Sequence, residues 1–359
     1  LVNVLLNVNN EFAAPRGIGV GPSHFPGAMA VADLNGDRKL DAAITNTETN
    51  DISVMLNQGD GTFGPAWRYP AGKRPEYIKA VELNGDGQLD LLVGNSNSND
   101  FTVLLNAGNG AFSQLDLPYD MGQSVGALDA LDVNDDGLPD LLVPASGWYA
   151  FLNQGNDKFS PPVRVGDSLL TPNSMRVVDL NGDGKVDLVT ASGGSFAVQM
   201  NQGAGTFADP LVLASTSGFS GYFGGLDVAD LTGDAMPDLV VVDKWADTMW
   251  VFFNDGNGAF GAGVSYDVGA YPSSVVASDL NGDGAIDLAV ANAFDGSASI
   301  FMNEGNGSFK AAGAFAAGWG PRAIAAGDIN DDGRPDILAA VVGEGSISQL
   351  NILPNVCMP

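Results

Sequence analysis

The sequence predicts an all-β protein: a seven-bladed β-propeller whose blades are four-stranded antiparallel sheets. Two observations predict it. A nine-residue acidic segment recurs seven times in 359 residues, with starts separated by 49, 50, 47, 51, 49 and 49 residues. Each copy lies between short apolar stretches rich in strand-forming residues, and no apolar helical period appears. Four strands repeated at this period are typical of propeller blades, which leave only short sheet edges.

Each repeat contains the same elements in the same order. A short apolar strand such as 273–278 (SSVVAS) precedes the acidic segment, and a second such as 90–95 (DLLVGN) follows it. A third apolar run ends in Asn, as in 101–106 (FTVLLN), with alternate positions apolar. A glycine turn closed by an aromatic residue, as in 58–63 (QGDGTF), leads to a looser fourth strand. The whole chain, 1–359, is therefore expected to form one propeller domain.

The two ends of the chain are expected to share the last blade. Residues 2–7 (VNVLLN) match the third-strand pattern, so the N-terminal segment should complete the seventh blade and close the ring. Residues 346–352 (SISQLNI) match the same pattern and compete for that place. An open β-solenoid is the alternative fold, but its repeats are usually shorter and need capping repeats.

The acidic segments have the pattern of calcium-binding loops. Oxygen-bearing side chains occupy positions 1, 3, 5 and 9 of every copy, as in an EF-hand loop, where position 7 contributes its carbonyl and Gly at position 6 permits the turn. Up to seven structural Ca²⁺ ions are therefore expected. By position, the candidate ligands are Asp33, Glu82, Asp132, Asp179, Asp230, Asp279 and Asp328 at position 1; Asn35, Asn84, Asn134, Asn181, Thr232, Asn281 and Asn330 at position 3; Asp37, Asp86, Asp136, Asp183, Asp234, Asp283 and Asp332 at position 5; Lys39, Gln88, Leu138, Lys185, Met236, Ala285 and Arg334 at position 7; and Asp41, Asp90, Asp140, Asp187, Asp238, Asp287 and Asp336 at position 9.

Asx turns without a metal are the alternative explanation of these loops, because Asp, Asn and Gly favour turns. Three carboxylates per loop would repel one another strongly unless a cation neutralises them. Seven Ca²⁺ ions would bring the formal net charge from −28 to −14. Arg38 and Ala235 replace glycine at position 6, where a left-handed backbone is expected, so these two loops should bind more weakly.

Composition excludes several classes of function. The excess of 43 acidic over 15 basic residues disfavours nucleic acid and anionic membrane surfaces as partners. No apolar run approaches the roughly 20 residues that span a bilayer, so membrane insertion is not expected. His24 is the single histidine and no GxSxG motif occurs, which leaves little support for nucleophilic catalysis through histidine. Cys357 is the single cysteine, so no intrachain disulfide or thiolate zinc cluster is expected.

The D-x-N-x-D-G-x-x-D loop and the Phe-Gly turn, seen at 63–64 and 260–261, resemble the FG-GAP (VCBS) repeats. That family includes the seven-bladed heads of integrin α chains and a mushroom lectin that binds N-acetylglucosamine. The resemblance implies structural calcium in the loops between the first and second strands of each blade. It also implies that the ligand is held on the opposite face or in clefts between blades.

Aromatic and basic residues in the loops of the opposite face are the candidate ligand contacts. An aromatic ring stacks on a pyranose while polar neighbours bind its hydroxyls. Packing between blades and ordinary salt bridges are the alternatives for these side chains. The candidates are Phe25, Arg74, Tyr77, Trp148, Tyr222, Trp245, Tyr271, Trp319 and Arg322.

The expected function is binding. The sequence favours a calcium-stabilised propeller, secreted or at the cell surface, that recognises a carbohydrate or glycoprotein. Extracellular calcium modules bind at about 10⁻⁴–10⁻³ M, too weakly to fill in cytosol. A protein-binding or adhesion module like an integrin head is one alternative. A polysaccharide lyase or hydrolase that uses Tyr, Arg, Lys or paired carboxylates is the other.

Overall fold

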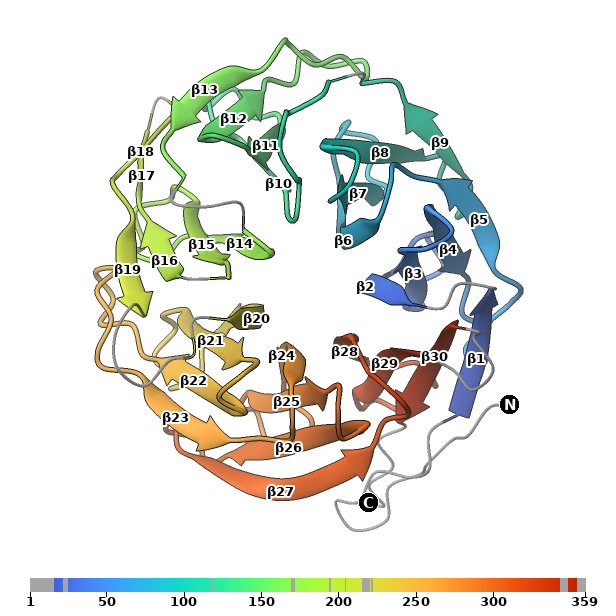
Figure 1. Cartoon of the computed structure of the whole chain (residues 1–359), viewed down its shortest axis with the longest axis vertical. Helices are drawn as coiled ribbons and strands as arrows, with labels where there is room; N and C mark the ends of the chain where they lie inside the picture. Colours follow the sequence, from blue (N-terminus) through green and yellow to red (C-terminus); the bar gives the residue numbers. More distant parts are fainter. Residues whose placement is uncertain are drawn as a thin grey trace.

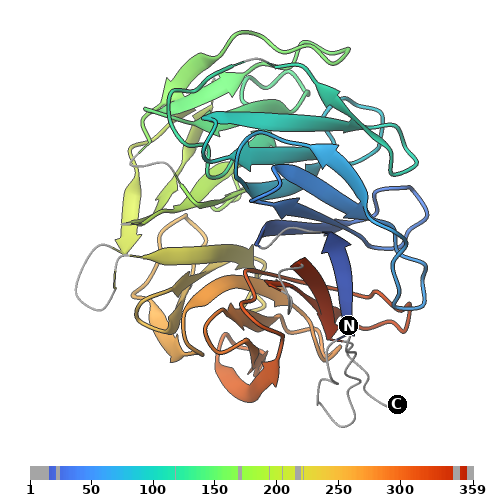
Figure 2. The same cartoon turned by 45° about the vertical axis from the view of Figure 1, so that its right-hand side comes forward.

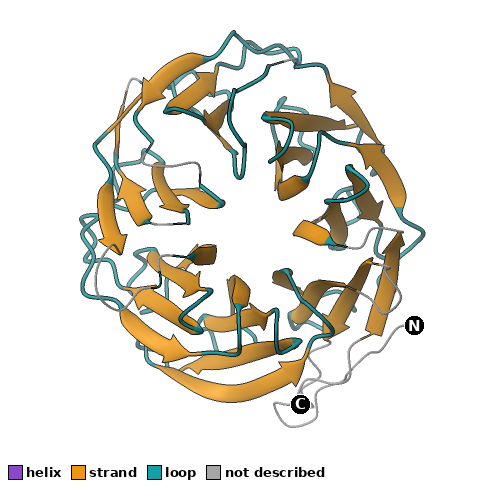
Figure 3. Cartoon of the chain, in the orientation of Figure 1, coloured by secondary structure: helices purple, strands orange, loops and turns teal. Residues whose placement is uncertain are grey.

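The computed structural model describes residues 16–21, 25–117, 119–168, 172–193, 195–203, 205–214, 220, 222–342 and 348–353. These residues form strands β1 to β30, and no helix occurs among them (Figure 3). None of them therefore belongs to a helix long and apolar enough to cross a membrane. His24 and Cys357 lie outside the described residues.

Seven four-stranded antiparallel sheets are arranged as blades in a ring (Figure 1). In each blade the first strand lies nearest the central axis and the fourth lies at the rim. From the axis outward, the blades are β2 (Pro26–Ala32), β3 (Asp41–Asn46), β4 (Asp51–Met55) and β5 (Trp67–Pro70); β6 (Pro75–Val81), β7 (Asp90–Asn95), β8 (Asp100–Asn106) and β9 (Phe112–Leu115); β10 (Asp129–Leu131), β11 (Asp140–Pro144), β12 (Trp148–Phe151) and β13 (Val163–Gly166); β14 (Ser174–Val178), β15 (Asp187–Ala191), β16 (Phe196–Gln199) and β19 (Leu211–Ala214); β20 (Phe223–Ala229), β21 (Asp238–Asp243), β22 (Thr248–Phe252) and β23 (Val264–Asp267); β24 (Pro272–Ser278), β25 (Asp287–Asn292), β26 (Ser297–Asn303) and β27 (Phe309–Ala316); and β28 (Ala323–Gly327), β29 (Asp336–Val342), β30 (Ser348–Leu353) and β1 (Arg16–Gly21). The predicted fold class and element order are confirmed.

The glycine turn between the third and fourth strands is fixed by the Asn that ends the third strand. Asn57 pairs with Phe63 across this turn, and Asn254 pairs with Phe260 in the same way. In blade 4 the turn has the same length and forms a small hairpin of β17 (Asn201–Gly203) and β18 (Thr206–Phe207), in which Asn201 pairs with Phe207. The repeated Asn and aromatic residues of the sequence therefore mark one turn geometry in successive blades.

The last blade differs in detail from the prediction. The candidate third strand 2–7 lies outside the described residues, and the competing segment supplies that strand as β30, which pairs with β29. The N-terminal segment contributes β1 instead, as the fourth strand, paired antiparallel with β30 at the rim (Figure 2). Because β30 follows β29 in the chain, the two form a hairpin, and the outer edge of β30 is then available to β1.

The hydrophobic core lies between neighbouring blades. Ile52 and Val54 of blade 1 share one cluster with Ile78 and Leu91 of blade 2. Other clusters join blades 2 to 4, 4 to 5, 5 to 6, 6 to 7 and 7 to 1. Because both faces of each blade are covered, the second strands are buried along almost their whole length. Each fully buried aliphatic side chain contributes about 1.5–3 kcal/mol.

Four innermost strands carry alternating charges around the axis. Lys79 of β6 donates to buried Asp129 of β10 at 2.6 Å, and Arg176 of β14 donates to Asp227 of β20 at 3.1 Å. Burial raises the pKa of the Asp129 carboxyl, whereas Lys79 and Arg176 act to lower it. The same position in the other three blades holds Val276, Ala325 and Ala30. Cations near the axis of blades 2 to 5 are thus paired with acids of a neighbouring blade.

Candidate functional site

The seven acidic loops join the first and second strands of their blades, as predicted. Position 9 of each loop is the first residue of the second strand, so the loop runs directly into the sheet. Position 2 is an apolar residue with at most 2% of its surface exposed, so it anchors the loop in the core. These anchors are Leu34, Leu83, Val133, Leu180, Leu231, Leu280 and Ile329.

Two backbone positions in every acidic loop are left-handed. At position 6, Arg38 has a φ of 69° and Ala235 a φ of 67°, which confirms the predicted left-handed turn there. Position 4 is left-handed too, and in two loops it is occupied by Asp135 (φ 61°) and Asp331 (φ 60°). A left-handed backbone costs a residue with a Cβ atom about 1–2 kcal/mol. These four side chains therefore sit where glycine would be less strained.

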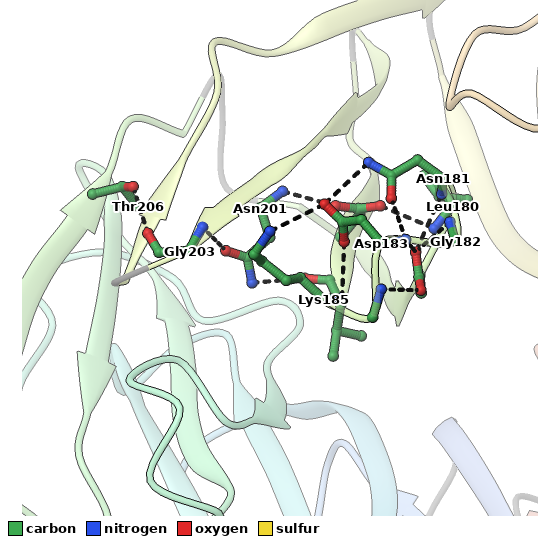
Figure 4. A network of polar contacts seen from close by, with 12 residues as sticks. Leu180, Asn181, Gly182, Asp183, Lys185, Asn201, Gly203 and Thr206 are labelled. Atoms are coloured by element: carbon green, nitrogen blue, oxygen red, sulfur yellow. Dashed lines mark hydrogen bonds and ion pairs between the residues drawn. The ribbon is translucent and has the colours of Figure 1, made fainter.

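Side-chain oxygens of the loop accept hydrogen bonds from the loop's own backbone. In the fourth loop, Asp179 Oδ2 accepts the N–H of Gly184 at 2.8 Å. Asn181 Oδ1 accepts the N–H of Asp183 at 3.0 Å, and Asp183 Oδ1 accepts that of Lys185 at 2.9 Å (Figure 4). These are Asx-turn contacts, so the loop has a defined conformation set by its own carboxylates and amides.

In blades 1 to 6, the carboxylate at position 9 joins the acidic loop to the end of the third strand. Asp287, fully buried, accepts the N–H of Leu280 at 3.0 Å and the N–H of Asn303 at 2.8 Å. The Asn303 side chain then donates to the carbonyl of Leu231, in the acidic loop of the preceding blade, at 2.7 Å. We call this arrangement the Asp–Asn link. Equivalent bonds to the preceding blade run from Asn57 to Ile329, Asn106 to Leu34, Asn153 to Leu83 and Asn254 to Leu180.

Burial and crowding disfavour the charged form of the position 9 carboxylates. Burial is the largest cause, and it raises the pKa of Asp41, Asp90 and Asp287 to about 6. Two backbone N–H groups oppose the rise, while the carboxylates at positions 5 and 1 of the same loop add to it. The electrostatic repulsion expected from the sequence is therefore present in these loops.

The chemistry of the loops fits a hard cation. In the described part of the chain, no three His, Cys, Asp or Glu side chains come together in an arrangement that could hold a metal ion. The side-chain atoms that could coordinate a metal in these loops are nevertheless all oxygens, the ligands that Ca²⁺ prefers. A carboxylate oxygen that accepts one N–H keeps a second lone pair for a metal. In the fifth loop, the buried Thr232 hydroxyl at position 3 has no hydrogen-bond partner. The donor set thus suits Ca²⁺.

The loops of the opposite face are tied to one another through their backbones. In blade 6, the N–H groups of Ala293 and Phe294 donate to the carbonyls of Tyr271 (3.0 Å) and Ala270 (3.1 Å). The N–H of Tyr271 donates to Asp247 Oδ1 of blade 5 at 2.8 Å. The backbones of these loops are therefore fixed relative to one another by these bonds.

Four aromatic side chains form a continuous row on this face. We call Tyr222, Trp245, Tyr271 and Phe294 the aromatic row; they belong to blades 5 and 6. Ring centroids are 6.1 Å apart for Tyr222 and Trp245, 5.3 Å for Trp245 and Tyr271, and 4.4 Å for the stacked rings of Tyr271 and Phe294. Half or more of the surface of Tyr222, Trp245 and Phe294 is exposed. Trp319, 73% exposed, lies in the loop before the first strand of blade 7, as Tyr222 and Tyr271 do in blades 5 and 6.

The sequence matches the FG-GAP-like repeat family in six overlapping stretches: 33–93, 82–143, 132–190, 179–241, 230–290 and 279–339. The chain belongs to this family. No curated protein matches the sequence. The solved structures similar to this FG-GAP propeller show its fold. An Agrocybe aegerita lectin, described as recognising non-reducing terminal N-acetylglucosamine, is 19% identical with a TM-score of 0.57, covering 83% of this chain and 81% of the lectin.

Two further solved structures have the same fold as this FG-GAP propeller. BBS1N in complex with ARL6DN is 14% identical with a TM-score of 0.63, covering 94% of this chain and 95% of that one. A putative 6-phosphogluconolactonase from Bacteroides fragilis is 14% identical with a TM-score of 0.63, covering 90% and 96%. Identities this low show the shared architecture alone.

Two residues predicted as exposed ligand contacts of this FG-GAP propeller are buried instead. Trp148 is 1% exposed and donates from Nε1 to Gln199 Oε1 at 2.8 Å, which links blades 3 and 4. Tyr77 is 7% exposed and packs in the core between blades 2 and 3. Both side chains fill space between blades, which is the alternative that the sequence left open.

The remaining candidates lie at or near the surface. Tyr222, Trp245 and Trp319 are exposed as expected, while Tyr271 is half-buried within the aromatic row. Phe25 is 37% exposed, with the Arg322 guanidinium 5.2 Å from its ring centroid. Arg74, the last candidate, forms a salt bridge to Glu76 at 2.8 Å, which is the alternative that the sequence left open for it.

Phe294 was missed by the sequence analysis, although it is 70% exposed. It stands two residues after the end of the second strand in blade 6, where Trp245 stands in blade 5. Comparing the second-to-third strand loops of all repeats position by position would have found it.

Replacing Ala235 with Gly is expected to raise the free energy of unfolding by about 1 kcal/mol, because glycine removes the left-handed strain at position 6. Urea unfolding measures the change. The control is Ala285→Gly at position 7 of the sixth loop, which has no positive φ and should lose about 0.5–1 kcal/mol. Equal effects of the two substitutions would contradict the strain at Ala235.

The protein in a chelator is expected to become more stable as the pH falls from 7 to 5. The folded pKa of Asp41, Asp90 and Asp287 is about 6, above the ordinary 3.8, so the folded state binds protons that the unfolded chain does not. This stabilisation is complete at low pH and is lost as the pH rises through 6. Melting temperatures in EDTA at pH 5, 6 and 7 measure it; a higher value at pH 7 than at pH 5 would contradict it.

Proposed function

We propose that this FG-GAP propeller is an extracellular, calcium-stabilised protein that binds carbohydrate through the aromatic row. The observation that carries the proposal is the row itself: Trp245 and Phe294 are 59% and 70% exposed on loops held by backbone hydrogen bonds. Exposed aromatic rings supply faces for sugar rings, and the polar groups beside them bind hydroxyls.

The rigidity of these loops supports a binding role. Exposed apolar side chains that form a continuous patch, rather than scattered single residues, mark sites of interaction. Aromatic side chains held in advance lose little conformational entropy when a ligand arrives, so more of the contact energy appears as affinity. The similar fold of a lectin described as recognising N-acetylglucosamine supports a sugar as the ligand.

Calcium is the second part of the proposal. In each loop, oxygen-bearing side chains at positions 1, 3 and 5 belong to the same turn as the buried carboxylate at position 9, whose charged form is disfavoured in Asp287. A divalent cation would offset that cost and stabilise the folded state by mass action. Sites of moderate affinity fill at extracellular calcium concentrations, which supports a secreted or surface location.

A protein ligand is the alternative, and it is favoured by the residue types in and beside the aromatic row. Trp, Tyr, Phe and Arg are the residues enriched in the energetic centres of protein interfaces, and Trp319 and Arg322 adjoin the aromatic row. BBS1N, which has the same fold, was solved in complex with ARL6DN. The binding experiment below separates the two ligand classes.

Trp245→Ala and Phe294→Ala are each expected to weaken binding to a glycan found on an array by about tenfold, because each removes a ring face worth about 1–2 kcal/mol. Titration calorimetry measures the affinity. Trp67→Ala is the matched control: this Trp is 43% exposed on β5, at the rim of blade 1, and its loss should leave binding unchanged. Absence of any glycan, with capture of a protein partner through the same residues, would favour the alternative.

Asp332→Asn is expected to lower the number of bound Ca²⁺ ions by one, whereas Asp331→Asn leaves the number unchanged. Both remove one negative charge from the same loop, but only Asp332 occupies ligand position 5. The Asn side chain keeps an oxygen that accepts the N–H of Arg334, so the turn persists. Equilibrium dialysis counts the ions, and chelation should lower the melting temperature by mass action. A folded protein that binds no Ca²⁺ at millimolar concentration would contradict the calcium proposal.

A further inference from the structure

Two cations beside the aromatic row have no acidic partner. Lys244 directly precedes Trp245, and Arg322 follows Trp319 by three residues. Lys79 and Arg176, in the innermost strands, each form an ion pair with an acid of the next blade. Among the described residues, neither Lys244 nor Arg322 forms one. In a chain with 43 acidic and 15 basic residues, such a pair of cations needs an explanation.

Lys244 is held against the inner strand of its own blade. Its N–H donates to the carbonyl of Tyr222, the first residue of the aromatic row, at 2.9 Å. Its side chain passes over Gly224: a Cβ atom there would lie 2.9 Å from Lys244 Cε and 3.0 Å from the carbonyl oxygen of Ser273. The lysine stem therefore runs inward from the row, toward the neighbouring blade 6.

Arg322 approaches the same place from blade 7. Ser273 Oγ donates to the carbonyl of Pro321, the residue before Arg322, at 2.8 Å. The Arg322 guanidinium carbon lies 5.2 Å from the centroid of Phe25, a cation–π contact that orients the side chain without neutralising it. Ser273 thus lies beside Gly224, over which the Lys244 side chain passes, and it also bonds the residue that precedes Arg322.

The electrostatics of the two cations are unfavourable as they stand. Burial lowers the pKa of Lys244, and the positive charge of Arg322 lowers it further. Among the described residues, the only acid that acts on Lys244 in the opposite sense is Glu76, which is already paired with Arg74 at 2.8 Å. Keeping two like charges together costs free energy unless an anion lies near both.

We propose that Lys244 and Arg322 bind the carboxylate or sulfate group of an acidic glycan whose neighbouring sugar rings contact the aromatic row. This inference rests on the proposed carbohydrate-binding function and names the class of sugar. Charge-assisted hydrogen bonds to such a group are about twice as strong as neutral ones. A free anion would satisfy the cations but would leave the aromatic row without a partner.

The negative net charge of the whole chain does not prevent an acidic glycan from binding at Lys244 and Arg322. The acidic loops lie at the other end of the blades, and exposed charges are screened over about 8 Å at physiological ionic strength. Asp243, Asp247 and Asp295 lie beside the aromatic row, and each accepts a backbone N–H, from Trp245 at 3.3 Å, from Tyr271 at 2.8 Å and from Ala270 at 2.6 Å. Their charges are thus partly compensated by the loops that they hold.

The test compares oligogalacturonate with the neutral oligosaccharide of equal length made by reducing its carboxyl groups. We expect the acidic chain to bind about tenfold more tightly, and Lys244→Gln with Arg322→Gln to abolish that difference. Lys158→Gln with Lys310→Gln is the matched control, because these lysines also form no ion pair among the described residues. Melting curves confirm folding; Arg322→Gln alone, at an exposed residue, serves if the double variant is unstable.

Each other outcome overturns the inference in a distinct way. Equal binding of acidic and neutral chains, weakened by Phe294→Ala but not by Arg322→Gln, removes the acidic-sugar site and leaves the carbohydrate function standing. Competition by inorganic sulfate as effective as that by the oligosaccharide would show a free anion site. If no glycan binds and a protein is captured instead, both the inference and the proposed function fail.

Discussion

The buried carboxylate of the Asp–Asn link is the interaction on which the rest of the structure depends. One oxygen holds the start of the acidic loop and the other holds the end of the third strand, as Asp287 does for Leu280 and Asn303. The amide of that Asn then reaches the acidic loop of the preceding blade. In the five blades that form this bond, a blade cannot shift against the preceding one without breaking the link and opening an apolar interface.

The same carboxylate creates the electrostatic problem of the loop. A charged group taken out of water is costly, and two N–H groups compensate it only in part, as the raised pKa of Asp287 shows. Its loop neighbours at positions 1 and 5 add further negative charge. The position 9 carboxylate therefore both orders the blade and adds to the charge repulsion within the loop. A bound cation would cancel that repulsion and so stabilise the ordered loop.

Much of the architecture could be predicted because the repeat imposes it. The period fixed the number of blades, and glycine at position 6 indicated the left-handed turn that Ala235 also adopts. The seventh blade could not be resolved in this way, because two segments carry the same alternating pattern and chain connectivity decides between them. Burial of Trp148 depends on Gln199, 51 residues away, and the exposure of Phe294 depends on packing between loops. Such contacts leave no trace in local spacing.

The position of the aromatic row limits how many ligands one molecule could bind through it. Seven nearly equal blades would allow seven equivalent faces, yet the row occupies two neighbouring blades, and its cations come from blades 5 and 7. The ring is thus pseudosymmetric in architecture, but the proposed binding surface lies on one side of it. If this patch is the binding surface, one molecule holds one ligand through it, and bridging two polymer strands in this way would require a second copy of the chain.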